Sequence, residues 1–182
     1  MGIFDFLQRD KKTAEEYFVL ATEKVQINSY EEAIKFYDKA LEKNNNYTDA
    51  YHDRGHCKDC LQDYSGAILD FNKAIELEPN DAMSYYNRGR SKYALQDYSG
   101  VIKDNLMALK LFDEYDHLPL YVPDNIKQLI HLNNGLARNN LMEFELAIDC
   151  FTQAIKLDPD YADAYQNRAV SNMCLDNFND AL

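Results

Sequence analysis

Apolar residues in this chain recur three or four positions apart within short segments. Between residues 64 and 75, apolar residues with this spacing are Tyr64, Ala67, Ile68, Phe71, Ala74 and Ile75. This spacing is the period of an amphipathic helix, whereas a half-buried strand would alternate at every second residue. No segment alternates in that way, so the sequence predicts an all-α protein.

A longer period is superimposed on the helical one. At five places an aromatic residue is followed three residues later by a small apolar one: Tyr30/Ala33, Tyr64/Ala67, Tyr98/Val101, Phe144/Ala147 and Phe178/Ala181. The aromatic residues of these pairs are 34, 34, 46 and 34 residues apart. A fixed period of this length indicates stacked units, each too small to bury its apolar face alone.

These spacings and residue types resemble the tetratricopeptide repeat, a helix-turn-helix unit of 34 residues. The resemblance implies units at 14–47, 48–81, 82–115 and 128–161, and a partial unit at 162–182. Residues 1–13 would form an N-terminal arm or short helix. The family fold implies an α-solenoid, wound as a right-handed superhelix whose first helices line a concave groove. The DRG, NRG and DYSGAI segments are similar to bacterial members of the family.

The last unit is expected to lack a cover. Asn177 is expected to open a second helix that stops after one turn, which leaves the faces of Tyr165, Ala169 and Met173 unpacked. Because a solenoid end normally carries a polar capping helix, this end favours either a fragment of a longer protein or end-to-end dimerisation. Upstream, Ser29-Tyr-Glu-Glu32 has the spacing of a capping box.

The regular spacing is broken by an insertion at 116–127, in which Pro119 and Pro123 exclude a continuous helix. Nearby, Asn105 stands where the other complete units have Tyr37, Phe71 and Phe151. We therefore expect the third and fourth units to stack differently, with Tyr121 of the insertion as a candidate aromatic cover. The alternative is a tolerated surface loop.

The chain is acidic, with 31 Asp and Glu against 19 Lys and Arg and a net charge of −12. This charge disfavours nucleic acid and anionic membrane surfaces, and it favours a basic or neutral partner. No apolar run approaches the ~18 residues of a membrane span, and no secretory signal is recognisable. Four cysteines without the spacing of a disulfide framework favour the reducing cytoplasm.

In the family that the chain resembles, side chains on the inner faces of the first helices contact ligands. Asn87, Asn133 and Asn167 occupy one equivalent position there, with Asp53 in the second unit. A primary amide both donates and accepts, so such a ladder can pair with the backbone of an extended peptide. The predicted peptide-binding residues are His52, Asp53, His56, Tyr86, Asn87, Arg90, Tyr93, Asn133 and Asn167.

Within this set, Tyr86, Arg90 and Tyr93 are of the residue types that dominate binding hot spots. The face that carries Tyr86 is expected to lie outside the core, so that Tyr86→Ala would leave the fold intact. The alternative interpretation of the whole surface is a solvated face without a ligand.

A metal site is a weaker alternative. His52, His56 and Cys60 are four residues apart and fall on one helical stripe, and all three are plausible zinc ligands. No flanking turn orients them, so groove lining is the favoured interpretation. Catalytic motifs such as GxSxG, HExxH and a phosphate-binding glycine loop are missing, and neither an enzyme nor a cofactor is expected.

The sequence therefore favours an adaptor or scaffold that binds a polypeptide in its groove. The competing hypotheses are a self-assembly module that uses the uncovered C-terminal end and, less favoured, a metal-dependent sensor.

Overall fold

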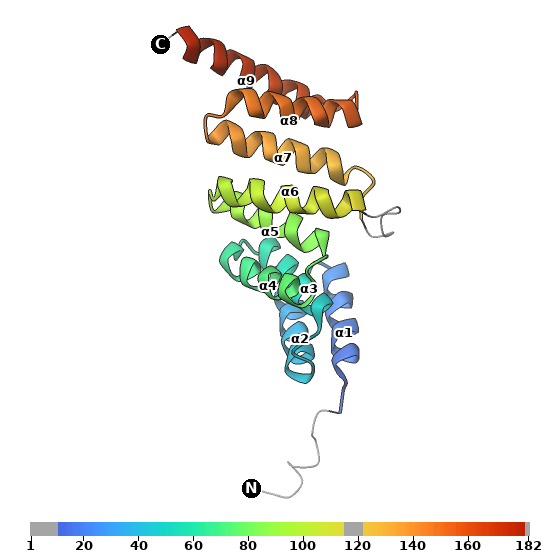
Figure 1. Ribbon diagram of the computed structural model, residues 1–182. Helices are drawn as coiled ribbons and strands as arrows, with labels where there is room; N and C mark the ends of the chain where they lie inside the picture. The colour runs from blue at the N-terminus through green and yellow to red at the C-terminus, as the bar shows by residue number, and fades with distance from the viewer. Residues whose placement is uncertain (1–10, 115–121, 181–182) are drawn as a thin grey trace, which may run out of the picture. The chain divides into compact units, whose positions relative to one another are not determined.

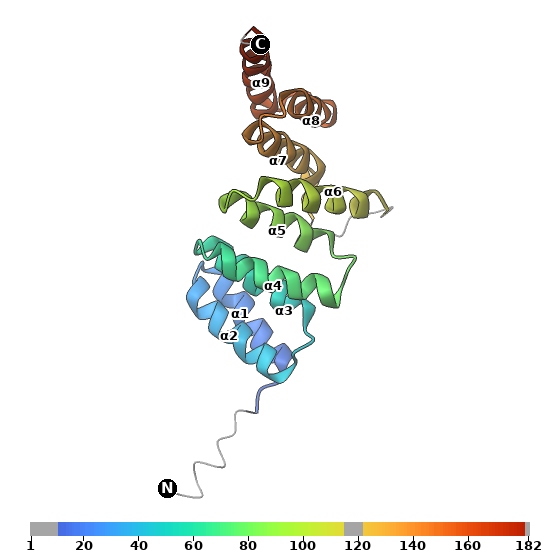
Figure 2. The ribbon, with the colours of Figure 1, turned by 60° about the vertical axis from the view of Figure 1, so that its left-hand side comes forward.

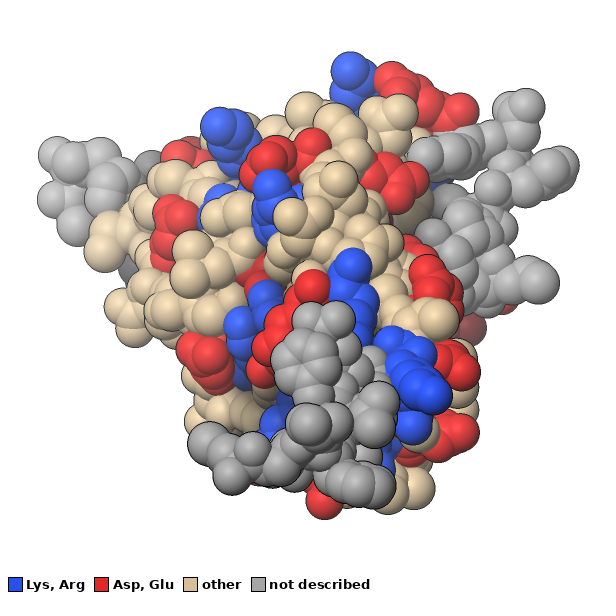
Figure 3. Space-filling model, turned by 90° about the horizontal axis from the view of Figure 1, so that it is seen from below, with Lys and Arg blue, Asp and Glu red and all other residues tan. Residues whose placement is uncertain are grey.

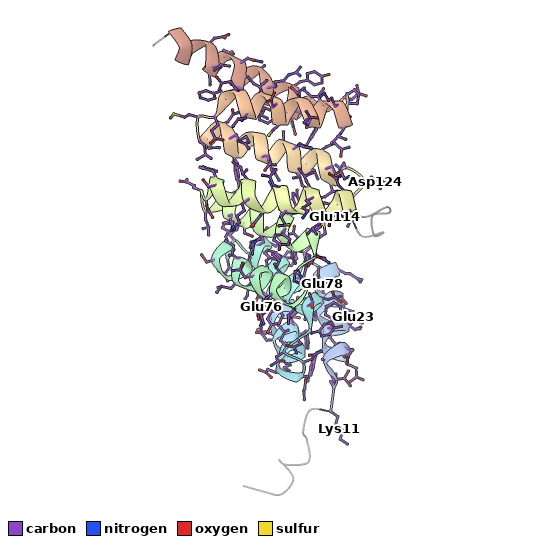
Figure 4. The ribbon with its side chains drawn as sticks, in the orientation of Figure 1. Lys11, Glu23, Glu76, Glu78, Glu114 and Asp124 are labelled. Atoms are coloured by element: carbon purple, nitrogen blue, oxygen red, sulfur yellow. The ribbon has the colours of Figure 1, made fainter. Side chains whose placement is uncertain are left out.

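The computed structural model describes residues 11–114 and 122–180, with side chains described as far as Asp176 in the last helix. Lys11 and Glu114, labelled in Figure 4, mark the ends of the first range. Most of the N-terminal arm and the candidate cover Tyr121 lie outside the described residues. Of the insertion, Val122 is buried in the same apolar cluster as Ile126.

Within the described residues the chain forms nine helices and no strand (Figures 1 and 2). They are α1 Ala14–Gln26, α2 Tyr30–Lys43, α3 Thr48–Cys60, α4 Tyr64–Leu77, α5 Ala82–Ala94, α6 Tyr98–Glu114, α7 Ile126–Asn140, α8 Phe144–Leu157 and α9 Ala162–Asp180. Successive helices pack as hairpins, α1 on α2, α3 on α4, α5 on α6 and α7 on α8. The expected all-α array of helical hairpins is confirmed.

The array divides into two compact units, Met1–Pro79 with α1–α4 and Asn80–Leu182 with α5–α9. In the first unit α2 contacts α3, and in the second α6 contacts α7 and α8 contacts α9. Each hairpin is thus stacked on the next within its unit, and the apolar core runs between the helices. This stacking places the first helices of neighbouring hairpins beside one another: α5 contacts α7, and α7 contacts α9.

Each hairpin turn has the same backbone geometry. The turn residue adopts a left-handed conformation with φ between 57° and 64° at Asn28, Gln62, Gln96 and Met142. At the first turn, the Asn28 N–H donates to the carbonyl of Val25 and the Ser29 N–H to that of Lys24. This pair of bonds is a Schellman motif, which satisfies carbonyls that the end of a helix leaves without partners.

The capping box expected at Ser29 is wrong. Ser29 precedes α2 without a side-chain capping bond, and its N–H donates to the carbonyl of Lys24 in the turn, so this N–H does not form the reciprocal bond to Glu32. The Glu32 carboxylate pairs instead with Lys24, 2.6 Å from its Nζ. A complete capping box forms at the start of α1, where the Thr13 N–H donates to Glu16 and the Glu16 N–H donates to Thr13.

The second helix expected from Asn177 is also wrong, because α9 continues unbroken through Asp176 to Asp180. Asp176 corresponds to the left-handed turn residues of the other hairpins, and that conformation costs ~1–2 kcal/mol in a residue other than glycine. Elsewhere the burial of a second helix offsets this cost. Among the described residues no second helix packs back on α9, so this cost is not offset there. The C-terminal half of α9 extends away from α8 (Figures 1 and 2).

Buried carboxylates tie the two helices of a hairpin together. Asp104 on α6 is 1% exposed and accepts from Arg88 Nε at 2.8 Å and Nη2 at 2.6 Å, while Lys92 Nζ lies 2.8 Å away. Arg54 and Asp70 form the equivalent bidentate pair between α3 and α4. Because these pairs are buried, removing one partner leaves the other charge without compensation.

We expect Asp104→Ala to lower the free energy of unfolding by about 3–5 kcal/mol, because Arg88 and Lys92 are then left partly buried without their anion. The matched control is Asp113→Ala, which removes an exposed partner of Lys127 and is expected to cost less than about 1 kcal/mol. Urea unfolding followed by circular dichroism measures both. Equal losses in the two variants would contradict the buried-pair interpretation.

Candidate peptide-binding surface

The second unit brings several of the predicted peptide-binding residues together. Tyr86, Arg90 and Tyr93 lie on successive turns of one face of α5. Asn133 reaches the same place from α7, the neighbouring first helix. Four predicted residues, three from one unit of the repeat and one from the next, therefore form one local surface.

These side chains surround a pocket of about 200 Å³. Its lining is completed by the backbone of Gly89 and by Val101 of α6, so its walls are aromatic, aliphatic and polar in turn. Asn140 donates from Nδ2 to the Tyr93 hydroxyl over 3.3 Å and joins the end of α7 to α5. No pattern in the sequence indicated this contact, because the two residues belong to different repeats and occupy different positions in them.

The expectation that Tyr86 lies outside the core is wrong. Its side chain is 7% exposed and packs in the apolar cluster of the second unit with Phe112, Ile126 and Ile130. Burial raises the pKa of the Tyr86 hydroxyl, and this rise is opposed by the charge of Arg90 and a hydrogen bond with the Asn133 side chain. Tyr86 is therefore both a core residue and a wall of the pocket.

The three asparagines of the predicted ladder differ in burial and in hydrogen bonding. Asn87 is buried, whereas Asn133 and Asn167 are partly exposed. Asn167 donates from Nδ2 to the carbonyl of Asp163 over 2.8 Å, within its own helix. Helical position alone could not reveal these differences, which depend on what packs above each residue. Contact of the three amides with a peptide stays a prediction.

The remaining predicted residues lie in the first unit. His52 packs edge-on against the ring of Phe71 with centroids 5.7 Å apart, and Asp53 accepts from the Tyr37 hydroxyl over 3.3 Å. His56 Nε2 and Cys60 Sγ are 3.8 Å apart. Among the described residues, no three His, Cys, Asp or Glu side chains are grouped to hold a metal ion, so the zinc hypothesis gains no support.

The charged surface is mixed in sign. On the face shown in Figure 3, Lys and Arg side chains are interspersed with Asp and Glu. The described side chains of the pocket in the second unit include one cation, Arg90, and no carboxylate. The excess of carboxylates over the whole chain is therefore not found among the lining residues of this pocket. None of the described helices combines the length and apolarity of a membrane span.

The fold and this surface define a helical-hairpin repeat protein. A family model described as TPR repeat matches residues 61–98 and 131–173, and one described as Tetratricopeptide repeat matches 14–47. Together these matches cover more than half of the sequence, and the chain belongs to the tetratricopeptide repeat family. Proteins of this family are generally non-catalytic modules that mediate protein–protein interactions.

A relative of known sequence agrees with this assignment. Small glutamine-rich tetratricopeptide repeat-containing protein beta of Homo sapiens is 37% identical over 82 residues, which are 42% of this chain and 26% of that protein. The chain thus spans about a quarter of that relative's length.

Solved structures share the fold at low sequence identity. A structure of MamA from Desulfovibrio magneticus RS-1 superposes with a TM-score of 0.80 at 20% identity, and covers 92% of this chain and 88% of its own. YrrB, described as a TPR protein with an unusual peptide-binding site, gives a TM-score of 0.77 at 22% identity, with 97% and 85% covered. The similarity of the repeat sequences to bacterial members of the family stays a prediction.

We expect Tyr86→Ala to lower the free energy of unfolding by about 3–5 kcal/mol, because it removes a buried ring from the core of the second unit. Tyr86→Phe keeps the ring and is expected to cost much less. Thermal unfolding of both variants beside the unchanged protein measures the difference. A melting temperature unchanged by Tyr86→Ala would restore the view that this residue lies outside the core.

Proposed function

We propose that the protein is an interaction adaptor, and that the surface formed by α5 and α7 in its second unit binds a polypeptide. The observation that carries this proposal is the pocket lined by Tyr86, Arg90, Tyr93 and Asn133. It combines aromatic rings, a guanidinium and an amide, which are side chains that anchor peptides.

The ligand is inferred to be an extended segment with neutral or basic character overall. The net charge of −12 attracts basic segments over a distance, whereas the pocket offers short-range contacts to an apolar or aromatic side chain. Peptide binding is a property stated for the structural neighbour YrrB. We propose the cytoplasm as the compartment, in agreement with four free thiols at Cys57, Cys60, Cys150 and Cys174.

The binding surface can be tested without knowing the partner. A displayed library of random peptides is selected against the protein, and dissociation constants of the selected peptides are measured by fluorescence anisotropy. We expect Arg90→Ala and Tyr93→Ala each to weaken binding about tenfold or more, since hot-spot truncations cost roughly 2 kcal/mol.

The control for this experiment is Lys110→Ala, whose side chain is 67% exposed on α6 and does not line the pocket. It should bind with unchanged affinity. A selection that yields no binders, or binders that respond equally to the three substitutions, would refute the proposal for this surface.

A second candidate function is self-association through α9. The faces expected to be uncovered are exposed: Tyr165 is 44% and Met173 66% exposed, and Ala169 is exposed between them. In the complete hairpins the positions of Ala169 are Ala21, Gly55, Gly89 and Gly135, all buried by a second helix. A second copy of the chain could supply an equivalent cover.

If α9 mediates dimers, light scattering should show a mass that rises with concentration, and Met173→Glu should keep the protein monomeric by placing a charge in the contact. The matched control is Gln153→Glu, which adds the same single charge at an exposed position of α8 and should leave the association unchanged. A constant monomer mass for the unchanged protein would rule out this second candidate.

A further inference from the structure

In three of the four complete hairpins, the second helix carries an aromatic side chain at the repeat position of Asn105, and this ring packs against the first helix. Tyr37 lies with its ring 5.6 Å from that of Phe18, and Phe71 with its ring 5.7 Å from that of His52. These rings also cover a small residue. A Cβ built on Gly55 would lie 2.9 Å from Phe71 Cε1, so only glycine leaves room for the ring there.

The hairpin of α5 and α6 has Asn105 in place of that ring. Asn105 is 1% exposed and donates from Nδ2 to Asn134 Oδ1 over 3.0 Å, while its own Oδ1 has no hydrogen-bond partner among the described residues. A Cβ on Gly89 would lie 2.9 Å from this Oδ1, so the amide end stands where the ring stands elsewhere. An asparagine side chain is much smaller than a phenylalanine ring and leaves space.

The pocket of the second unit lies at this place. Three of its lining residues are Tyr86, Gly89 and Val101. They correspond in the repeat to His52, Gly55 and Ala67 of the preceding hairpin, where the ring of Phe71 packs against His52 and Gly55. The pocket is therefore bounded by positions that enclose an aromatic ring in a neighbouring hairpin.

We infer that this pocket takes an aromatic side chain of the bound polypeptide, which fills the place of the ring that Asn105 lacks. The inference rests on the proposed function and adds the class of side chain that the site selects. Tyr86 and Tyr93 offer ring faces and edges to a guest ring, and Gly89 lets it approach the backbone of α5.

Arg90, an exposed residue of the pocket lining, favours a ring over an aliphatic side chain. Elsewhere in this chain, guanidinium groups lie over tyrosine rings at 5.5 Å for Arg54 and Tyr51, and at 5.2 Å for Arg88 and Tyr85. A guest ring beside Arg90 gains the same attraction between cation and π-system, which leucine cannot provide.

The test uses the full chain and small probes, N-acetyl-L-phenylalaninamide and N-acetyl-L-leucinamide, followed in two-dimensional ¹H–¹⁵N NMR spectra. We expect the phenylalanine probe to bind with a dissociation constant of the order of 1 mM, as fits a ligand of its size. The shifted signals should be those of Gly89, Arg90, Val101 and the Asn133 side chain. The leucine probe should bind at least several-fold more weakly.

A variant that supplies the ring from the protein itself sharpens the test. Asn105→Phe should abolish the response to the phenylalanine probe, because the pocket is then occupied. Its matched control is Leu106→Phe, which adds the same ring at a neighbouring, 53% exposed position and should bind the probe normally. If Asn105→Phe does not fold, the comparison of the two probes on the unchanged protein still decides.

Equal responses to both probes, shifts away from the pocket, or undiminished binding in folded Asn105→Phe would overturn the inference. The outcome is separable from that of the proposed function. Library peptides that depend on Arg90 and Tyr93 but show no aromatic preference would leave the adaptor function standing and refute the aromatic pocket. A phenylalanine-specific response without any selected peptide would support the pocket and refute peptide binding.

Discussion

The close packing of two helices within each hairpin is the constraint on which the rest of this structure depends. A small residue on the first helix, such as Gly55 or Gly135, faces a ring on the second, Phe71 or Phe151, with no room for a Cβ. Repeating this contact fixes the distance between helices, and the fixed distance allows one hairpin to stack on the next within a unit. The left-handed turns reverse the direction of the chain between the two helices, and the packing contact sets the distance between those helices.

Buried ion pairs add a second, directional contact to this packing. Asp104 with Arg88, and Asp70 with Arg54, cross from one helix of a hairpin to the other at the same repeat position. A buried bidentate pair tolerates little displacement, so it fixes the register of the two helices while the rings fix their separation. These charged residues are consequently part of the framework, in contrast to Arg90, which is exposed beside the pocket.

The third hairpin is where the packing rule is relaxed. Asn105 replaces the ring, keeps one hydrogen bond to Asn134, and leaves an oxygen without a partner among the described residues. A buried polar group without a partner lowers the free energy of unfolding, so Asn105 is expected to make this hairpin less stable than a ring would. Its place beside Gly89 connects this irregularity with the surface proposed to bind a polypeptide. In this protein, the proposed binding surface therefore lies at the hairpin whose sequence departs from the repeat pattern.

The sequence by itself determined the helices, their pairing and the family, because helical periodicity and a 34-residue step are local or regularly spaced properties of the chain. It also indicated Asn105 as irregular and brought Tyr86, Arg90, Tyr93 and Asn133 onto one candidate surface. Only the tertiary structure decided that Tyr86 is buried, that Ser29 forms no capping box, and that α9 continues through Asp176. Each of these depends on which groups from other helices pack nearby, and helical position does not specify those neighbours.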